Sequence, residues 1–434
     1  MFSKVLLRLC APLLLACPVF SFLNAQTVWE RDPGFAGGDT IHLGNGRAEE
    51  AIAGMAQLPD GKILAAGRLN NSLSYILARY EANGQPDPAF GVNGTTVFPI
   101  TGFTGGAKDI LTLPGGQFIL GASSDDAQGA QVFTLIRFLP DGRPDSTFGA
   151  NGLAFGAASP GLADKLNAIL RQPDGKILAA GSSFADGAPS DQQSVMLSRF
   201  LANGKKDNTF GANGTVRLPY PGQNFEFHAL ALQPDGRIVA AGSNDDLILV
   251  ARFQPNGQPD STFGLHGVRQ LQYSAAGKTR CRAVSVLPGG KILLGGWCHE
   301  YWLNNGAVLV RLQPDGASDP TFGNSGIIGM SFVHCDYQLS TSAMVVQGDG
   351  RIVLATNGQN NDPKGVSGIF RFLPDGTVDS SFAVNGEWLQ AVGSGNSALC
   401  AVFLTTDGKI LAGGTAKERD DYDFMLLRLY AHGD

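Results

Sequence analysis

The sequence predicts an all-β fold, a seven-bladed β-propeller of four-stranded antiparallel blades, and three observations carry that prediction. One hairpin phrase, written Leu-Pro-Asp-Gly-Lys-Ile-Leu-Ala-Ala-Gly at 58–67, returns along the 434 residues at intervals of about 58 until seven copies are complete. Each copy reads as four short strands separated by turns rich in Pro, Asp, Asn and Gly. After the first 25 residues no segment shows a helical period of apolar residues. Repeated all-strand units of this kind favour a closed ring over a sandwich or a solenoid.

The fourth repeat illustrates how each unit is expected to fold. Its first two strands flank Pro234, Asp235 and Gly236. Pro fixes φ at the first corner and Gly accepts a positive φ, so we expect a tight hairpin turn there. The four strands are expected at 229–233, 237–242, 247–253 and 268–273.

The two ends of the chain each hold part of one repeat. The last copy stops at 430–434, where its fourth strand should begin, and 32–43 reads as the missing tail of a repeat. We therefore expect the strand at 40–43 to complete the last blade, which closes the ring and protects the sheet edges. In the alternative phase this strand is the inner strand of the first blade, which also gives seven blades.

Residues 1–25 resemble a secretory signal peptide, because Lys4 and Arg8 precede an apolar stretch and Ala25 offers a small-residue cleavage point. We expect 26–434 to form one β-propeller domain of an exported protein, secreted, periplasmic or on the cell surface. The run ending at Cys17 also resembles a lipobox, so a lipoprotein anchored through Cys17 is the alternative.

Charge and hydropathy narrow the range of partners. The net charge of −6 argues against nucleic acid and anionic membrane surfaces, and no later apolar run reaches the ~20 residues of a spanning helix. The expected partner is an extracellular or envelope glycan, peptide or protein, and the protein is expected to be a monomer.

Four cysteines follow the signal segment. Cys281 and Cys298 flank the fifth hairpin, so we predict a disulfide between them, with an offset of one residue if the turn is bulged. The pairing of Cys335 and Cys400 stays open, and the spacings do not fit a zinc site.

Two phrases carry a family resemblance, Gln-Pro-Asp-Gly-Lys-Ile-Leu-Ala-Ala-Gly at 172–181 and Arg-Phe followed by Pro-Asp-Ser-Thr-Phe-Gly at 252–264. They resemble the bacterial delta-60 repeat family over residues 32–434. The resemblance implies an exported, propeller-like bacterial protein. The departures are mild, since Gly115 and Gly289 replace the turn Asp in two copies.

Residues that recur in every copy are interpreted as structural, because a stacked core demands them once per blade. We expect the Phe to fill the interface between blades, the Asp to hold the Phe-Gly turn, and the Arg to donate to turn carbonyls or to that Asp. The arginines are Arg79, Arg137, Arg199, Arg252, Arg311, Arg371 and Arg428; the aspartates are Asp32, Asp87, Asp145, Asp207, Asp260, Asp319 and Asp379; the phenylalanines are Phe35, Phe90, Phe148, Phe210, Phe263, Phe322 and Phe382.

Residues that differ between copies are where function is expected. The position seven residues before the hairpin Asp, at the entry of the innermost strand, does not repeat. Around the ring it reads Ala53, Lys108, Asn167, His228, Arg282, Ser342 and Cys400. We expect Lys108, His228 and Arg282 to form a cationic rim for an anionic or sugar ligand, with Asn167 and Ser342 beside them. A solvated channel mouth without a ligand is the alternative.

Acidic residues gather in the variable loops, at 125–126, 245–246, 362 and 418–423. None has the spacing of a known calcium loop, so calcium lacks a specific motif and no cofactor is expected. No catalytic motif is found either, and we predict no catalytic residue.

Two functional classes remain open. The favoured class is a non-enzymatic binding scaffold whose ligand lies on the variable-loop face; a shallow aromatic groove of Trp297, Tyr301 and Trp302 would support it. The other class is a metal-assisted hydrolase or lyase with its site in the central channel. Its candidate metal ligands are His228, Asn167 and Glu226.

Overall fold

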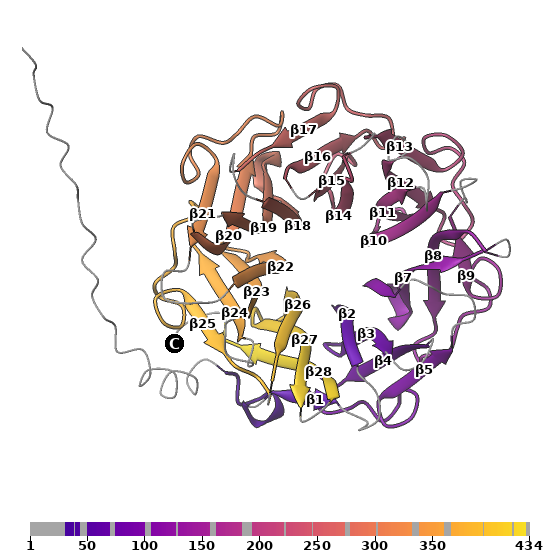
Figure 1. The fold of residues 1–434 in the computed structure, drawn as a ribbon. Helices are drawn as coiled ribbons and strands as arrows, with labels where there is room; N and C mark the ends of the chain where they lie inside the picture. The colour runs from indigo at the N-terminus through magenta and orange to yellow at the C-terminus, as the bar shows by residue number, and fades with distance from the viewer. Residues whose placement is uncertain are drawn as a thin grey trace, which may run out of the picture.

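The structure is a computed structural model. It describes residues 31–38, 40–43, 50–69, 74–99, 106–126, 129–156, 162–184, 193–220, 223–244, 246–273, 278–300, 303–331, 338–359, 366–393, 395–418 and 421–430. Within these residues the strands form seven four-stranded antiparallel sheets around a central channel, so the predicted seven-bladed propeller is confirmed (Figure 1). The helical elements of the described residues are single 3-10 turns, η1 (Ala36–Gly38), η2 (Pro114–Gly116) and η4 (Pro288–Gly290), and none of them could cross a membrane.

Each blade uses four strands, innermost first. Blade 1 holds β2 (Glu50–Gln57), β3 (Ile63–Leu69), β4 (Ser74–Tyr80) and β5 (Thr95–Pro99). Blade 2 holds β6 (Ala107–Thr112), β7 (Phe118–Asp125), β8 (Gln131–Phe138) and β9 (Leu153–Phe155). Blade 3 holds β10 (Ala163–Arg171), β11 (Ile177–Phe184), β12 (Ser194–Phe200) and β13 (Thr215–Pro219). Blade 4 holds β14 (Glu226–Leu232), β15 (Ile238–Ser243), β16 (Ile248–Phe253) and β17 (Val268–Leu271).

The remaining blades follow the same order. Blade 5 holds β18 (Lys278–Val286), β19 (Ile292–Glu300), β20 (Leu303–Leu312) and β21 (Ile327–Ser331). Blade 6 holds β22 (Gln338–Val346), β23 (Ile352–Gln359), β24 (Val366–Phe372) and β25 (Glu387–Gln390). Blade 7 holds β26 (Ser397–Leu404), β27 (Ile410–Glu418), β28 (Asp421–Leu429) and, at its outer edge, β1 (Ile41–Leu43).

The hairpin turns follow the chemistry of their Gly residues. In blade 4 the Gln233 amide donates to the Arg237 carbonyl at 2.8 Å, and the Gly236 amide donates to Gln233 at 2.9 Å. Gly236 has φ near 84°, which completes a three-residue loop. The inner strand β14 starts at Glu226, three residues before the predicted start, so the strand reaches further toward the opposite face than expected.

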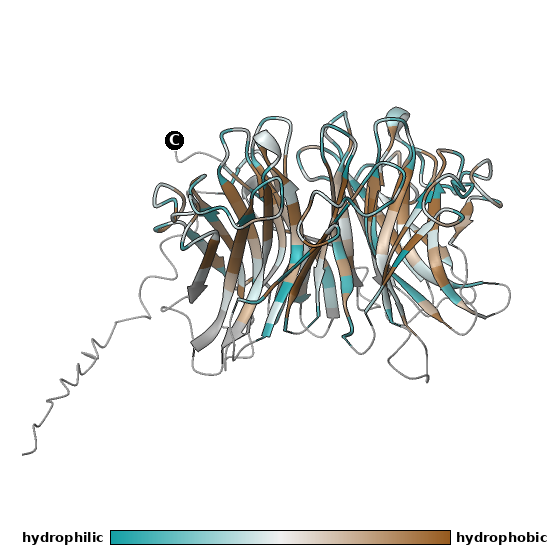
Figure 2. Ribbon diagram, turned by 90° about the horizontal axis from the view of Figure 1, so that it is seen from above, coloured by the Kyte–Doolittle hydropathy of each residue, from teal (hydrophilic) through white to brown (hydrophobic). Residues whose placement is uncertain are grey.

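The N-terminal strand closes the ring, as predicted. Ile41 pairs with Leu426 and Leu43 pairs with Phe424, which places β1 on the outer edge of blade 7. The ends of the ring are thereby joined by backbone hydrogen bonds, and the phase with 40–43 as an inner strand is wrong. Figure 2 shows most of the hydrophobic residues on the strands, and the coloured loops at one edge of the disc are more hydrophilic.

The repeated Arg, Asp and Phe form the predicted structural unit. In blade 1, Asp87 Oδ2 accepts a hydrogen bond from Arg79 Nε at 2.6 Å, and Asp87 Oδ1 accepts one from the Ala89 amide. The Arg79 guanidinium lies 4.7 Å from the centre of the fully buried Phe90 ring and donates to the Pro140 carbonyl of the next blade. Each unit therefore joins a turn to its neighbouring blade. The same Arg-over-Phe contact recurs in the other six blades.

Candidate functional site

Every inner strand carries a β-bulge, and the bulge selects the residues that do not repeat. In blade 4, Phe227 pairs with Gly242 and Ala229 with Ala241, so His228 is the extra residue between two paired ones. The bulged residues of the seven blades are Ala53, Lys108, Asn167, His228, Arg282, Ser342 and Cys400. A bulged residue is free of the ladder that constrains its neighbours, which explains why this position varies.

A repeated Gly on the second strand makes room for the bulge. A Cβ added to Gly242 would lie 1.8 Å from the Glu226 carbonyl oxygen, and one added to Gly296 would lie 1.9 Å from the Arg280 carbonyl. In blades 3, 4, 5 and 7 the carbonyl two residues before the bulge thus occupies the space of a side chain, whereas blade 6 has Thr356 at this position. Ala122 takes this position in blade 2, where the described pairing ends.

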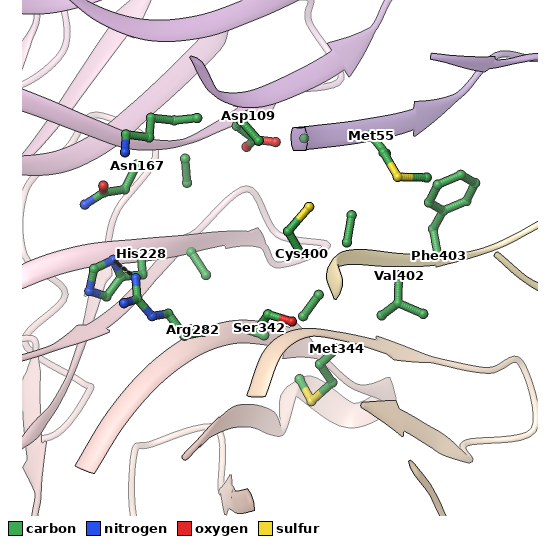
Figure 3. A pocket seen from close by; sticks show the side chains of 18 of the residues that line it. Met55, Asp109, Asn167, His228, Arg282, Ser342, Met344, Cys400, Val402 and Phe403 are labelled. Atoms are coloured by element: carbon green, nitrogen blue, oxygen red, sulfur yellow. Dashed lines mark hydrogen bonds between the residues drawn. The ribbon is translucent and has the colours of Figure 1, made fainter. Parts of the chain in front are cut away.

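All seven bulged residues line one central cavity of about 1000 Å³. Asn167, His228 and Arg282 lie on one side of this channel, and Met55, Val402 and Phe403 lie on the other (Figure 3). The predicted ring of unrepeated positions is therefore a ring in space.

Glu226 lies at the centre of the polar side. Both of its carboxylate oxygens accept hydrogen bonds from Lys165 Nζ at 2.9 Å, and Oε2 also accepts one from Asn167 Nδ2 at 3.1 Å. Burial opposes ionisation, but the hydrogen bonds and charge of the Lys165 ammonium, together with the Asn167 hydrogen bond, outweigh it and lower the pKa of Glu226. Glu226 is thus a carboxylate bridging blades 3 and 4.

His228 is neutral and contacts a guanidinium. Arg282 Nη1 lies 3.2 Å from His228 Nδ1, and because arginine can only donate, Nδ1 accepts and the proton sits on Nε2. Burial, reinforced by Arg282, lowers the pKa of His228 to about 3 even though Glu226 opposes the shift.

Lys108 and Arg282 lack acidic partners in the described part of the chain. Lys108 makes no hydrogen bond or ion pair there, and the recorded hydrogen bond of the Arg282 side chain goes to neutral His228. Burial, with Lys165 and Arg282 nearby, lowers the pKa of Lys108. Two half-buried cations thus face the channel without a carboxylate bound to them.

Ser342 and Cys400 belong to the packing of the ring. The Ser342 hydroxyl lies within hydrogen-bond distance of the Ala355 carbonyl at 3.2 Å and also of the Leu399 carbonyl of blade 7. The Cys400 thiol donates to the Gly413 carbonyl at 3.5 Å, and burial raises its pKa to about 12. These two groups are engaged with backbone, unlike Lys108.

A second cavity of about 740 Å³ adjoins the channel and shares His228, Arg280 and Arg282 with it. Its other lining residues are mostly polar: Lys165, Gln223, Asn224, Glu226, Ser243, Asn244, Asp246 and Leu247. Four cations face the two cavities, and we call them the cationic wall: Lys108, Lys165, Arg280 and Arg282.

Sequence reasoning missed Lys165 and Arg280, although a signal existed. Both lie two residues before the bulge, at a position that also differs between copies, and in blade 4 the same position holds Glu226. Asp109 was missed as well, where the other copies have Gly or Ala.

Asp109 connects two blades. Its Oδ2 accepts a hydrogen bond from the Ile169 amide of blade 3 and its Oδ1 accepts one from the Ile110 amide, both at 2.8 Å. Burial raises its pKa to about 6 despite these bonds.

The predicted disulfide between Cys281 and Cys298 is not formed, and both thiols are free and buried. The bulge at Arg282 sets Cys281 opposite Gly296 and Cys298 opposite Thr279. The two cysteines are therefore diagonal neighbours, whose separation of roughly 7–8 Å exceeds the reach of a disulfide.

Several other predictions concern the loops. Trp297 lines the channel, with the Arg280 guanidinium 5.5 Å from its ring centre, whereas Tyr301 and Trp302 lie outside the described residues, so the aromatic groove stays a prediction. Cys335 and Cys17 also lie outside them. In the described ranges no group of three His, Cys, Asp or Glu side chains could hold a metal ion.

Comparisons with known proteins agree with the fold. Six segments match the family described as "Domain of unknown function (DUF5122) beta-propeller", at 58–90, 116–148, 172–210, 233–263, 287–322 and 347–382. The six matched segments fall one in each of blades 1 to 6. No curated protein matches the chain.

Solved structures similar to this chain are distant in sequence. A virginiamycin B lyase from Staphylococcus aureus is 10% identical with a TM-score of 0.48, covering 90% of this chain and 99% of its own. A protein of unknown function from Dyadobacter fermentans is 11% identical, with a TM-score of 0.47 and coverage of 90% and 98%. A glucose dehydrogenase is 14% identical, with a TM-score of 0.44 and coverage of 91% and 99%.

Proposed function

We propose that this chain is an exported, non-enzymatic binding scaffold of the delta-60 repeat type. It holds an acidic group of a glycan, peptide or protein ligand in the central channel, entered from the variable-loop face. The observation that carries the proposal is the pair of half-buried cations, Lys108 and Arg282, which face a cavity of about 1000 Å³ without carboxylate partners in the described residues. Removing cations from water is costly, and an anion offsets that cost.

A metal-assisted hydrolase or lyase is the second candidate, because Asn167, Glu226 and His228 do converge. Several of their ligand atoms are already engaged: Lys165 binds both Glu226 oxygens, and Arg282 occupies His228 Nδ1. The positive charge of the cationic wall also opposes a divalent cation. Calorimetric titration with Mn²⁺ or Zn²⁺ distinguishes the two, since tight binding at one ion per chain would favour the enzyme.

The test is an array of acidic and neutral glycans and peptides probed with residues 26–434, with and without calcium. We expect acidic members to be retained, with binding that weakens as salt rises. Replacing Lys108, His228 and Arg282 together by Ala should abolish retention and leave the fold intact, because none of them belongs to the repeated core.

A matched control removes the same charge elsewhere. Arg143→Ala with Lys205→Ala deletes two cations from exposed turns and should leave retention unchanged. Retention of neutral members only, or full retention by the triple variant, would overturn the proposed site.

A further inference from the structure

The channel lining is divided between two arcs of blades. Every charged side chain that lines it comes from blades 2 to 5, namely Lys108, Asp109, Arg280 and Arg282, together with titratable His228. Blades 6, 7 and 1 form one continuous arc and contribute no charged group to the described lining. The channel is therefore asymmetric across its axis.

The uncharged arc is largely apolar. We call five of its lining side chains the neutral wall: Met55, Met344, Cys400, Val402 and Phe403. Phe403 and Met344 are only half-buried, so they still present apolar surface to the cavity. Thioethers and aromatic rings adapt to apolar groups of varied shape, which suits a ligand-facing surface.

Arg282 of the cationic wall lies on one side of the central cavity, and Met55, Val402 and Phe403 of the neutral wall lie on the other (Figure 3). Its volume of about 1000 Å³ lies at the upper end of the range for small-molecule sites. A fully hydrophilic acid would satisfy the cations but leave the neutral wall against water, and a neutral apolar compound would leave Lys108 and Arg282 without a bound acid group.

We propose that the channel binds an amphiphilic monoanion, with its acid group between Lys108 and Arg282 and its hydrocarbon or aryl portion against the neutral wall. This inference rests on the proposed function and narrows it to one ligand class. Arg282 is the group suited to grip two oxygens of the acid, because its planar guanidinium donates in a fixed fork.

Three probes distinguish the contribution of the cationic wall from that of the neutral wall. They are octyl sulfate, ethyl sulfate with the same head and a short tail, and octyl glucoside with the same tail and a neutral head. Calorimetry at concentrations below micelle formation should give one octyl sulfate per chain, bound at least tenfold more tightly than either of the other two. Vesicles of anionic phospholipid form a further arm, and we expect no binding to them because the cations lie inside the channel.

Two variants measure how much each wall contributes to the affinity for octyl sulfate. Arg282→Gln should reduce octyl sulfate affinity to that of octyl glucoside, and Met344→Gln should reduce octyl sulfate affinity at least fivefold while leaving ethyl sulfate unchanged. Melting temperatures check that each variant is folded, and the wild-type probe series stands alone if one is not.

The outcomes separate this inference from the proposed function. Equal affinity for ethyl and octyl sulfate would overturn the amphiphile and keep the anion site. Equal affinity for octyl sulfate and octyl glucoside, or binding to vesicles without one-to-one binding of octyl sulfate, would also overturn it. Failure of every acid on the array and in calorimetry would overturn both.

Discussion

At the scale of single residues, the channel concentrates groups whose protonation differs between the folded and unfolded chain. His228 titrates near 6.5 when unfolded and near 3 when folded, because burial and Arg282 disfavour imidazolium. Burial shifts the pKa of Asp109 in the other direction, from 3.8 to about 6. Shifted pKa values of several groups within one cavity are typical of functional sites, where the environment of each group serves binding or reactivity and not stability.

The His228 shift predicts acid sensitivity with a definite sign. Between pH 3 and 6.5 the unfolded chain binds a proton that the folded chain does not, so the free energy of unfolding rises with pH. From pH 7 to pH 5 this group alone should cost about 1–2 kcal/mol. Urea unfolding should show a smaller loss for His228→Gln, whereas Asp109 has the opposite slope between 3.8 and 6.

The control for this prediction is His266→Asn, at an exposed turn position that holds Asn in other copies. It should lose as much stability between pH 7 and pH 5 as the wild type. An identical loss in His228→Gln would show that His228 is not the buried neutral group described here.

At the scale of the element, the bulged inner strand is the device that lets one repeat serve two purposes. The paired residues around the bulge hold the strand in its ladder, while the extra residue lines the channel and is free to vary. The Gly on the second strand sustains this arrangement, since the displaced carbonyl occupies its side-chain space. A change at that Gly should therefore reach the site through the backbone.

Gly242→Ala should lose about 1–3 kcal/mol of stability, because its Cβ would lie 1.8 Å from the Glu226 carbonyl oxygen. The strand must then shift, which displaces Glu226 and His228. Gly348→Ala is the matched control, since no atom lies within 4 Å of its added Cβ, and it should change stability by less than about 0.5 kcal/mol. Equal melting temperatures for the two variants would contradict the role assigned to this Gly.

The blades were predictable from the sequence, whereas the bulges and their consequences were not. Residues that recur in every copy are those that packing requires in every blade. The structural role of Arg79, Asp87 and Phe90 could therefore be predicted before the fold was known. A bulge is a property of hydrogen-bond register and leaves no fixed residue signature. The Cys281–Cys298 prediction was wrong because it assumed an unbroken ladder. Lys165 was missed because the position two residues before the bulge was not compared between the copies, although Glu226 at that position was named.

At the scale of the whole molecule, stability depends on a ring whose last joint is non-covalent. Arg428 Nε donates to Asp32 Oδ2 at 2.6 Å, Lys409 Nζ donates to the same oxygen, and Phe35 is 1% exposed between blades 7 and 1. Blade 7 therefore uses the same Arg–Asp–Phe unit as the others, assembled from opposite ends of the chain.

Deleting residues 26–44 should expose the edge of β28 and lower the melting temperature of the whole domain. Removing residues 1–25 alone should have no such effect, because it leaves both Asp32 and β1 in the chain. A synthetic peptide spanning 31–43 should restore part of the lost stability by strand addition. An unchanged melting temperature after deletion of 26–44 would show that the ring does not need β1.

The joint between Asp32 and Arg428 also imposes an order of events on synthesis. These partners lie 396 positions apart, whereas the strands within blades 1 to 6 pair with close neighbours along the chain. Six blades can form as they emerge from the ribosome, but β1 must wait, unpaired, until the final hairpin is available. Because loop closure over such a separation is slow, completing the ring is expected to be the last and rate-limiting step of folding. Until that moment the newborn protein is an open arc with two exposed sheet edges, and this interval is when it is most exposed to aggregation and proteolysis.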